Sequence, residues 1–422
     1  MERLPNELLT IIVSLLVDPA PRERQRALLA VSRVSSRFRD IARPHLFRVM
    51  RIEYQAAKET NTFQDFCDFL DKDPYAFEHV SQHVQELIFD GVADRRFFSP
   101  DATMISVKLL RDILYHLPNL QSLGMRHMHI TRTVGEQLEC TRPSNIKKLL
   151  LRVIQVSEDD LLHVLSLFSR MQSLELFGAF QDETDPTEDH PPTSLPRIGH
   201  VLQHAVYPYT LFLESLADNI EQPIPSYAFV CTGLGHVRSV ADFLVRRGDS
   251  VTRLSLDLRA ISLDGRDDDE PNAGTPVDTV AALKSSFREC IALTHLHLCL
   301  PMSCECWQDS EADQAMFGTM MDVIRGIPPP TMRNLTIELV SARNAPHPGE
   351  HEHHLWTSVE KEGWKKLGEA YSWFEKIDSV ELIDDGDQYR KGVVAHQSEA
   401  VRQRQEVFKV PLQPIRADTL EG

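Results

Sequence analysis

The sequence predicts an α/β solenoid, with short parallel strands on one side and helices on the other, preceded by a head of three short helices. Three observations support this fold class. The 422 residues are too many for one compact core of ordinary size. An apolar triplet at positions i, i+3 and i+5 keeps returning along the body, and a helical stretch repeatedly precedes it. The composition, 42% hydrophobic and 25% charged, is typical of a folded protein.

The first fifty residues predict the three helices of the head. Pro5 and Glu7 stand where a helix would begin, and a broad apolar stripe follows at helical spacing, made of Leu8, Ile11, Ile12, Leu15 and Leu16. Further helices are expected over 22–33 and 35–42, with Pro44 ending the last. Three short helices bury little surface by themselves. We therefore expect part of the stripe to contact a partner.

Three motifs follow one another in this head: Leu4-Pro5-x-Glu7-Leu8-Leu9-x-x-Ile12, Val34-Ser35-x-x-Phe38 and Pro44-His45-Leu46-Phe47-Arg48-Val49. Together they resemble an F-box, in the form common in fungal proteins. The resemblance implies a helical module that binds a Skp-type adaptor and, through it, a cullin-RING ubiquitin ligase. It assigns adaptor contact to Leu4, Pro5, Leu8, Ile11, Ile12 and Leu15, supported by Val34 and Phe38.

Two departures from the family pattern are present in the head. The stretch from Pro19 to Val34 is longer than usual, and Phe38 stands where tryptophan is frequent.

The resemblance identifies the chain as a substrate-recognition subunit that binds a protein target through its solenoid. The alternative is a repeat scaffold with no link to ubiquitination, in which the three helices only cap the repeats.

The body contains eight copies of the apolar triplet. They are Val84/Leu87/Phe89, Leu120/Leu123/Met125, Ile146/Leu149/Leu151, Met171/Leu174/Leu176, Val251/Leu254/Leu256, Leu293/Leu296/Leu298, Met332/Leu335/Ile337 and Ile377/Val380/Leu382. Tyr227 to Cys231 is the candidate strand in the long gap before Val251. The asparagine usual after such triplets is missing, so the body resembles the leucine-rich repeats of F-box receptors only in outline. A conventional α/β domain is the alternative.

The chain is therefore expected to contain an F-box at 1–51, a helical linker at 52–80, a divergent leucine-rich-repeat-like substrate-binding region at 81–383 and a C-terminal tail at 384–422. Long acidic insertions follow several predicted strands, at 182–194, 264–276, 304–313 and 342–354. Because the ends of parallel strands share one rim, we expect these loops to form a binding surface, with Asp267 to Glu270 steering a basic target. The aromatic anchors predicted near this rim are Phe97, Phe98, Trp307 and Trp356.

Charge and cysteine usage limit the class of partner. The net charge is -17, although residues 1–51 carry ten arginines against five acidic residues. An acidic body argues against nucleic acid as the main partner. Seven scattered cysteines are typical of reduced thiols, and no segment is apolar for long enough to span a membrane, so we expect the cytoplasm or the nucleus.

Two segments rich in histidine are candidate metal sites. His295, His297, Cys299, Cys304 and Cys306 lie close together, but the first three alternate with leucines as one face of a strand would, and no second cysteine pair completes a zinc site. The histidines between 347 and 354 fit a solvated loop. No phosphate loop or nucleophile elbow is present in the sequence. We therefore expect no metal, no cofactor and no catalytic residue in this chain.

Overall fold

The computed structural model describes residues 4–16, 21–54, 62–72, 77–91, 103–132, 144–177, 195–204, 223–231, 233–258, 276–302, 310–341, 359–374 and 377–384. The chain forms two compact units, whose main parts are Met1–Ile198 and Gln222–Gly422, and the segment Gly199–Ala205 belongs to the second. Within the described ranges, no helix is long and apolar enough to cross a membrane.

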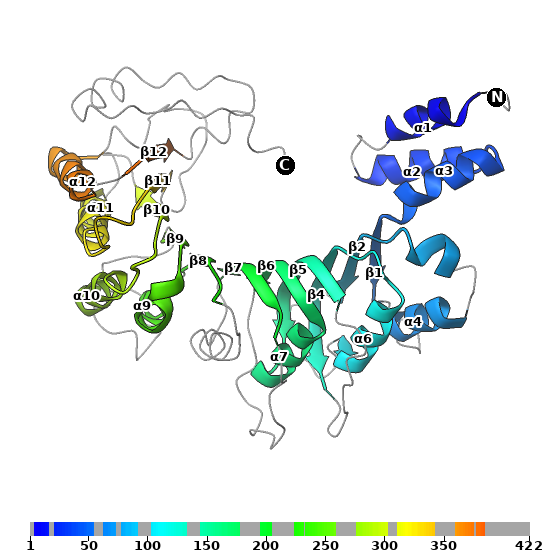
Figure 1. The fold of residues 1–422 in the computed structure, drawn as a ribbon, viewed down its shortest axis with the longest axis horizontal. Coiled ribbons are helices and arrows are strands. Elements are labelled where there is room, and N and C mark those ends of the chain that lie inside the picture. The colour runs from blue at the N-terminus through cyan, green and yellow to red at the C-terminus, as the bar shows by residue number, and fades with distance from the viewer. Residues whose placement is uncertain are drawn as a thin grey trace. The chain divides into compact units, whose positions relative to one another are not determined.

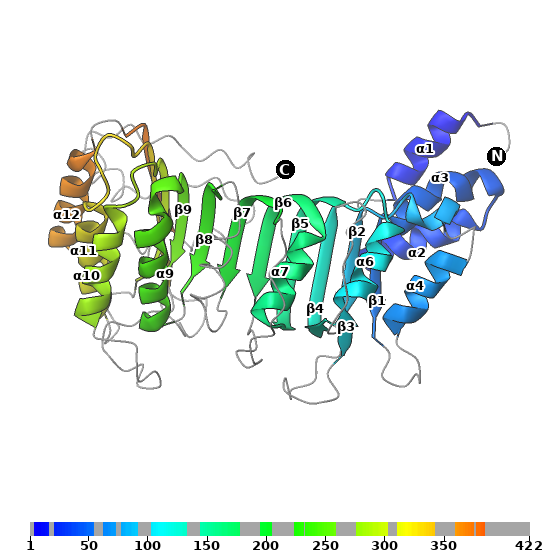
Figure 2. The same ribbon diagram turned by 60° about the horizontal axis from the view of Figure 1, so that its bottom comes forward.

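Unit 1 begins with the predicted head, whose helices are α1 (Asn6–Ser14), α2 (Pro21–Ser32) and α3 (Ser36–Phe47). A parallel sheet follows, formed by β1 (Val49–Glu53), β2 (Glu86–Asp90), β3 (Met104–Ser106), β4 (Ser122–Thr131), β5 (Ser144–Gln155) and β6 (Phe168–Phe177). The strand order is β1-β2-β4-β5-β6, and β3 pairs with the end of β4. One face of this sheet carries α4 (Thr62–Lys72), α6 (Val107–Tyr115) and α7 (Glu158–Ser166), as Figures 1 and 2 show.

Unit 2 repeats the same design. Its parallel strands are β7 (Arg197–His204), β8 (Ser226–Val230), β9 (Arg253–Asp257), β10 (His295–Met302), β11 (Asn334–Ser341) and β12 (Ser379–Asp384), paired in that order. The helices on one face are α9 (Leu234–Arg247), α10 (Pro276–Phe287), α11 (Ser310–Ile324) and α12 (Lys361–Trp373) (Figure 2). Short single turns also occur, η1 (Phe77–Ser81) in unit 1 and η2 (Gly248–Ser250) in unit 2.

The residues of the apolar triplets are buried, as predicted, except that Ile377 and Leu382 of the last triplet are part-buried. Equivalent apolar residues pair in register across neighbouring strands: Leu87, Leu123, Leu149 and Leu174 in unit 1, and Leu254, Leu296, Leu335 and Val380 in unit 2. All of these side chains are buried. Stacking the same apolar position from repeat to repeat therefore builds each core, which confirms the solenoid-like α/β fold.

A hydrogen-bond pattern also recurs at the start of the strands. Two consecutive backbone N–H groups donate to a single carbonyl oxygen of the preceding repeat, at 2.7–3.1 Å. The accepting carbonyls are those of Arg48, Gln85 and Gln121 in unit 1 and of Pro225, Thr252, Thr294 and Arg333 in unit 2. This pattern fixes the register of each strand against its neighbour, and it starts at Arg48, directly after the head.

Several elements differ from the expectation. The expected end of the third helix at Pro44 is wrong, because α3 continues to Phe47 and Leu46 packs against the core of the head. The segment 52–80, expected to be a helical linker, contributes the end of β1 and the whole of α4 to unit 1. In the gap before Val251, β8 confirms the candidate strand at Tyr227 to Cys231, and β7 is an additional strand.

Candidate functional site

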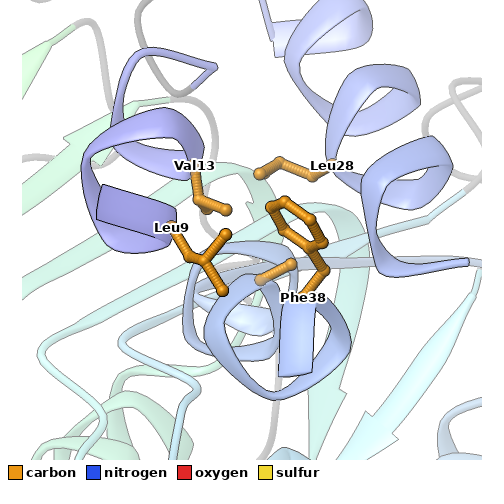
Figure 3. Close-up of a cluster of buried hydrophobic side chains, with 5 residues drawn as sticks. Leu9, Val13, Leu28 and Phe38 are labelled. Atoms are coloured by element: carbon orange, nitrogen blue, oxygen red, sulfur yellow. The ribbon is translucent and has the colours of Figure 1, made fainter. Parts of the chain in front are cut away.

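The head has a small apolar core of its own. Leu9 and Val13 of α1 are fully buried and point toward Leu28 of α2 and Phe38 of α3 (Figure 3). Leu9, Val13 and the next part-buried position, Leu16, are spaced at i, i+4 and i+7, so they lie on one face of α1. This face holds the first helix against the other two, and it includes Leu16, which the sequence had assigned to the apolar stripe.

Two polar contacts position the start of the head. The guanidinium of Arg37 in α3 donates to the Leu4 carbonyl oxygen at 3.0 Å and to the Asn6 side-chain oxygen at 2.5 Å. The hydroxyl of Ser35 accepts from the backbone N–H of Phe38 at 3.3 Å and caps α3. The Leu-Pro start is therefore attached to the third helix, which fixes the direction in which α1 leaves it.

Four of the five residues of the predicted stripe are exposed, all except Leu16. Leu8, Ile11, Ile12 and Leu15 are 46%, 55%, 40% and 66% exposed, and they lie at i, i+3, i+4 and i+7 on one face of the helix. The first helix is thus apolar on two faces, and one of them has no cover within the part of the head that the structure describes. Such a surface on a small domain marks a protein-protein contact.

The remaining predicted adaptor residues divide between surface and core. Pro5 is exposed at the N-terminal end of α1, and Leu4 is part-buried. Val34 is 56% exposed between α2 and α3, whereas Phe38 is buried. Phe38 therefore supports the site from the core. Sequence reasoning missed Leu29 of α2, which is 42% exposed.

The predicted target-binding aromatics lie outside the described residues. This holds for Phe97, Phe98, Trp307 and Trp356, and for most of the four acidic insertions. Two insertions end inside helices, since α10 begins at Pro276 and α11 at Ser310. The prediction of a binding rim therefore stays a prediction, and the structure describes the strand faces but not most of this rim.

The strand face of unit 2 contains two of the candidate metal ligands, His295 and His297. His297 Nδ1 lies 3.2 Å from Ser255 Oγ, and His297 Nε2 lies 3.1 Å from Glu338 Oε2. Burial and the nearby Arg253 hold the pKa of His295 below its ordinary value. Cys299 is buried, while Cys304 and Cys306 are outside the described residues. Among the residues that were searched, no group of three or more histidine, cysteine or acidic side chains could hold a metal ion.

The Ser255-His297-Glu338 chain has the residue types of a hydrolase triad. A triad also needs free N–H donors for the oxyanion that forms during acyl transfer. Ser255, His297 and Glu338 come from β9, β10 and β11, and each of these strands is paired on both sides, so their backbone amides are engaged in the sheet. We interpret these three side chains as a row of polar contacts that orders the strand face.

Comparison with known proteins agrees with the geometry of the head. Residues 1–53 match the family model described as F-box-like, and the match ends with β1. No curated protein shows a significant match to the chain. The head is therefore an F-box-like domain, and the family match covers none of the sheet beyond β1.

Proposed function

We propose that this chain is the substrate-recognition subunit of a Skp-cullin-F-box-type ubiquitin ligase. The exposed stripe of α1, made of Leu8, Ile11, Ile12 and Leu15, carries the proposal. The head already has a core on the other face of α1, so this stripe is available for a partner, and F-box domains generally bind Skp-type adaptors. The solenoid would then hold the protein target.

In this proposal the chain catalyses no step. Ubiquitin transfer is performed by the RING and conjugating subunits that the adaptor and cullin bring, so the receptor needs two binding surfaces and no reacting group. Such a receptor would act in the cytoplasm or the nucleus. The long acidic insertions would select the target together with the strand faces.

The test is co-purification of the full-length chain with a Skp-type adaptor. Leu8→Asp with Ile12→Asp places two carboxylates in the stripe, where they would be desolvated without partners on binding, and is expected to abolish the complex. The control is Val245→Asp with Ile291→Asp, which makes the same chemical change at apolar residues of unit 2 that are 52% and 58% exposed. This control variant should still co-purify with the adaptor. Equal recovery of the adaptor with both double variants would refute the proposal.

A further inference from the structure

The sheet of unit 2 ends at β12, whose outer side is incompletely covered. Among the strands that the structure describes, β12 pairs with β11 alone. In the triplets of β10 and β11, all three residues are at most 2% exposed. In the last triplet, Val380 is 8% exposed, and Ile377 and Leu382 are only part-buried. The last repeat of an array has no further repeat to cover its apolar positions, so it needs a cap.

The backbone of β12 also faces outward at alternate residues. The N–H of Ser379 donates to the Arg333 carbonyl of the preceding repeat at 3.1 Å. Successive N–H groups of a parallel strand point to opposite sides, so those of Val380 and Leu382 are directed to the outer edge. A sheet edge pairs with other chains unless something covers it. The cap of unit 2 should therefore offer both apolar side chains and a backbone that can pair with β12.

The apolar triplet returns once more in the C-terminal tail. Val407, Val410 and Leu412 stand at i, i+3 and i+5, which is the spacing of the eight triplets of the body. Val407 follows Ile377 by 30 residues, while consecutive triplets of the body are 25 to 45 residues apart outside the gap that contains β7 and β8. A parallel strand needs a connection of about a dozen residues or more, and 22 residues, 385–406, are available after β12.

We propose that residues 407–412 of this chain lie alongside β12 as a further parallel strand and cap unit 2. The three apolar residues of this segment then continue the rows of side chains that end at Ile377, Val380 and Leu382. The occupant of the edge is thus a segment of the same molecule, and its sequence repeats the pattern that the neighbouring strands use. The cap does not depend on the proposed function, because any array that ends at β12 would need one.

The register of the two triplets also brings complementary groups together. Lys409 stands diagonal to Glu381 on the strand face, and a long cation attracts a carboxylate at such a diagonal position. The N–H groups of Val380 and Leu382 donate to the carbonyls of Lys409 and Pro411. Pro411 has no N–H to donate to the Val380 carbonyl, so the capping strand makes one bond fewer than an internal strand. Proline in a sheet is found on edge strands, which is where this segment lies.

The test is hydrogen exchange of the full-length chain, read residue by residue. Val410→Asp with Leu412→Asp places two carboxylates among apolar side chains and should release the segment from β12. The N–H groups of Val380 and Leu382 should then exchange about tenfold faster or more, because they lose their acceptors. The N–H of Glu381 faces β11 and should change much less.

A matched control adds the same two charges to the tail outside the triplet. Val394→Asp with Leu420→Asp should leave the exchange of β12 as it is in the wild-type chain.

An exchange of charges tests the register. Lys409→Glu should speed exchange of the two outward N–H groups of β12 about two- to threefold, since it places two acidic residues on one diagonal. Adding Glu381→Lys to this variant should restore the wild-type rates.

Four results would overturn the inference. The first is equal exchange at Val380 and Leu382 in the wild-type chain and the double aspartate variant, since the tail would then not cover β12. The second is equal acceleration at Glu381, because β12 itself would then open. The third is protection that falls on dilution of the wild-type chain, which would assign the edge to a second copy. The fourth is no rescue by the exchange of charges.

Discussion

Replacing each of two adjacent leucines of α1 by alanine is expected to affect mainly stability at one position and mainly adaptor binding at the other. Leu9 is 1% exposed in the core of the head, and a Leu→Ala change at such a site costs about 3 kcal/mol, from lost burial and the cavity left behind. Leu8 is 46% exposed, so about half of the roughly 2 kcal/mol for its three carbon groups is at stake, or about 1 kcal/mol. On binding, Leu8 becomes buried, and its truncation should weaken the adaptor complex about tenfold.

The assay for this pair has two readouts on the full-length chain. Hydrogen exchange of the amides in α1, α2 and α3 reports the local free energy of opening, and titration with the adaptor reports affinity. Leu9→Ala should speed exchange throughout the head much more than Leu8→Ala does, since the costs are about 3 and about 1 kcal/mol, and Leu8→Ala should lower affinity. If Leu8→Ala speeds exchange as much as Leu9→Ala, the two-faced description of α1 is wrong. If neither variant lowers affinity, the stripe is not the adaptor site.

Single substitutions at Gly91, His236 and Arg37 should each change the stability of one part of the chain. Gly91→Ala should lower the urea midpoint of unit 1 strongly, because its Cβ would lie 1.9 Å from the carbonyl oxygen of His127, whereas Gly124→Ala should not. Burial lowers the pKa of His236 from 6.5 to about 4, so between these pH values the unfolded chain binds more protons than the folded chain. Unit 2 should therefore lose up to about 3 kcal/mol of unfolding free energy as the pH falls through that range. The denaturation midpoint should fall with pH, and His236→Gln should largely abolish this dependence. Arg37→Ala should speed exchange in α1 and lower adaptor affinity without changing the melting of unit 2.

The fold was predictable where one apolar spacing repeats. Leu149 and Leu174 are 25 residues apart in the sequence but face each other in the sheet, and the i, i+3, i+5 triplet was sufficient to identify both strands. In β7 the buried positions are Ile198, Val201 and the polar Gln203, so the third member of the triplet is not apolar. This strand could not be recognised from hydrophobic pattern alone.

The candidate sites were predictable to different degrees. The residues of the α1 stripe were identified from their spacing, but sequence could not decide which apolar face of α1 meets α2 and α3. That choice depends on Phe38, which lies on the side of Leu9 and Val13.

The head is joined to the sheet without a linker segment. Helix α3 ends at Phe47 and β1 begins at Val49, so a single residue, Arg48, separates them. The Arg48 carbonyl accepts the amides that start β2, and Arg43 of α3 contacts His79 at 3.3 Å. The F-box-like head and the first strands therefore belong to one compact unit without a flexible linker. A target held on the strand face of unit 1 would then keep a defined position relative to the adaptor stripe, which is what transfer of ubiquitin to particular lysines requires.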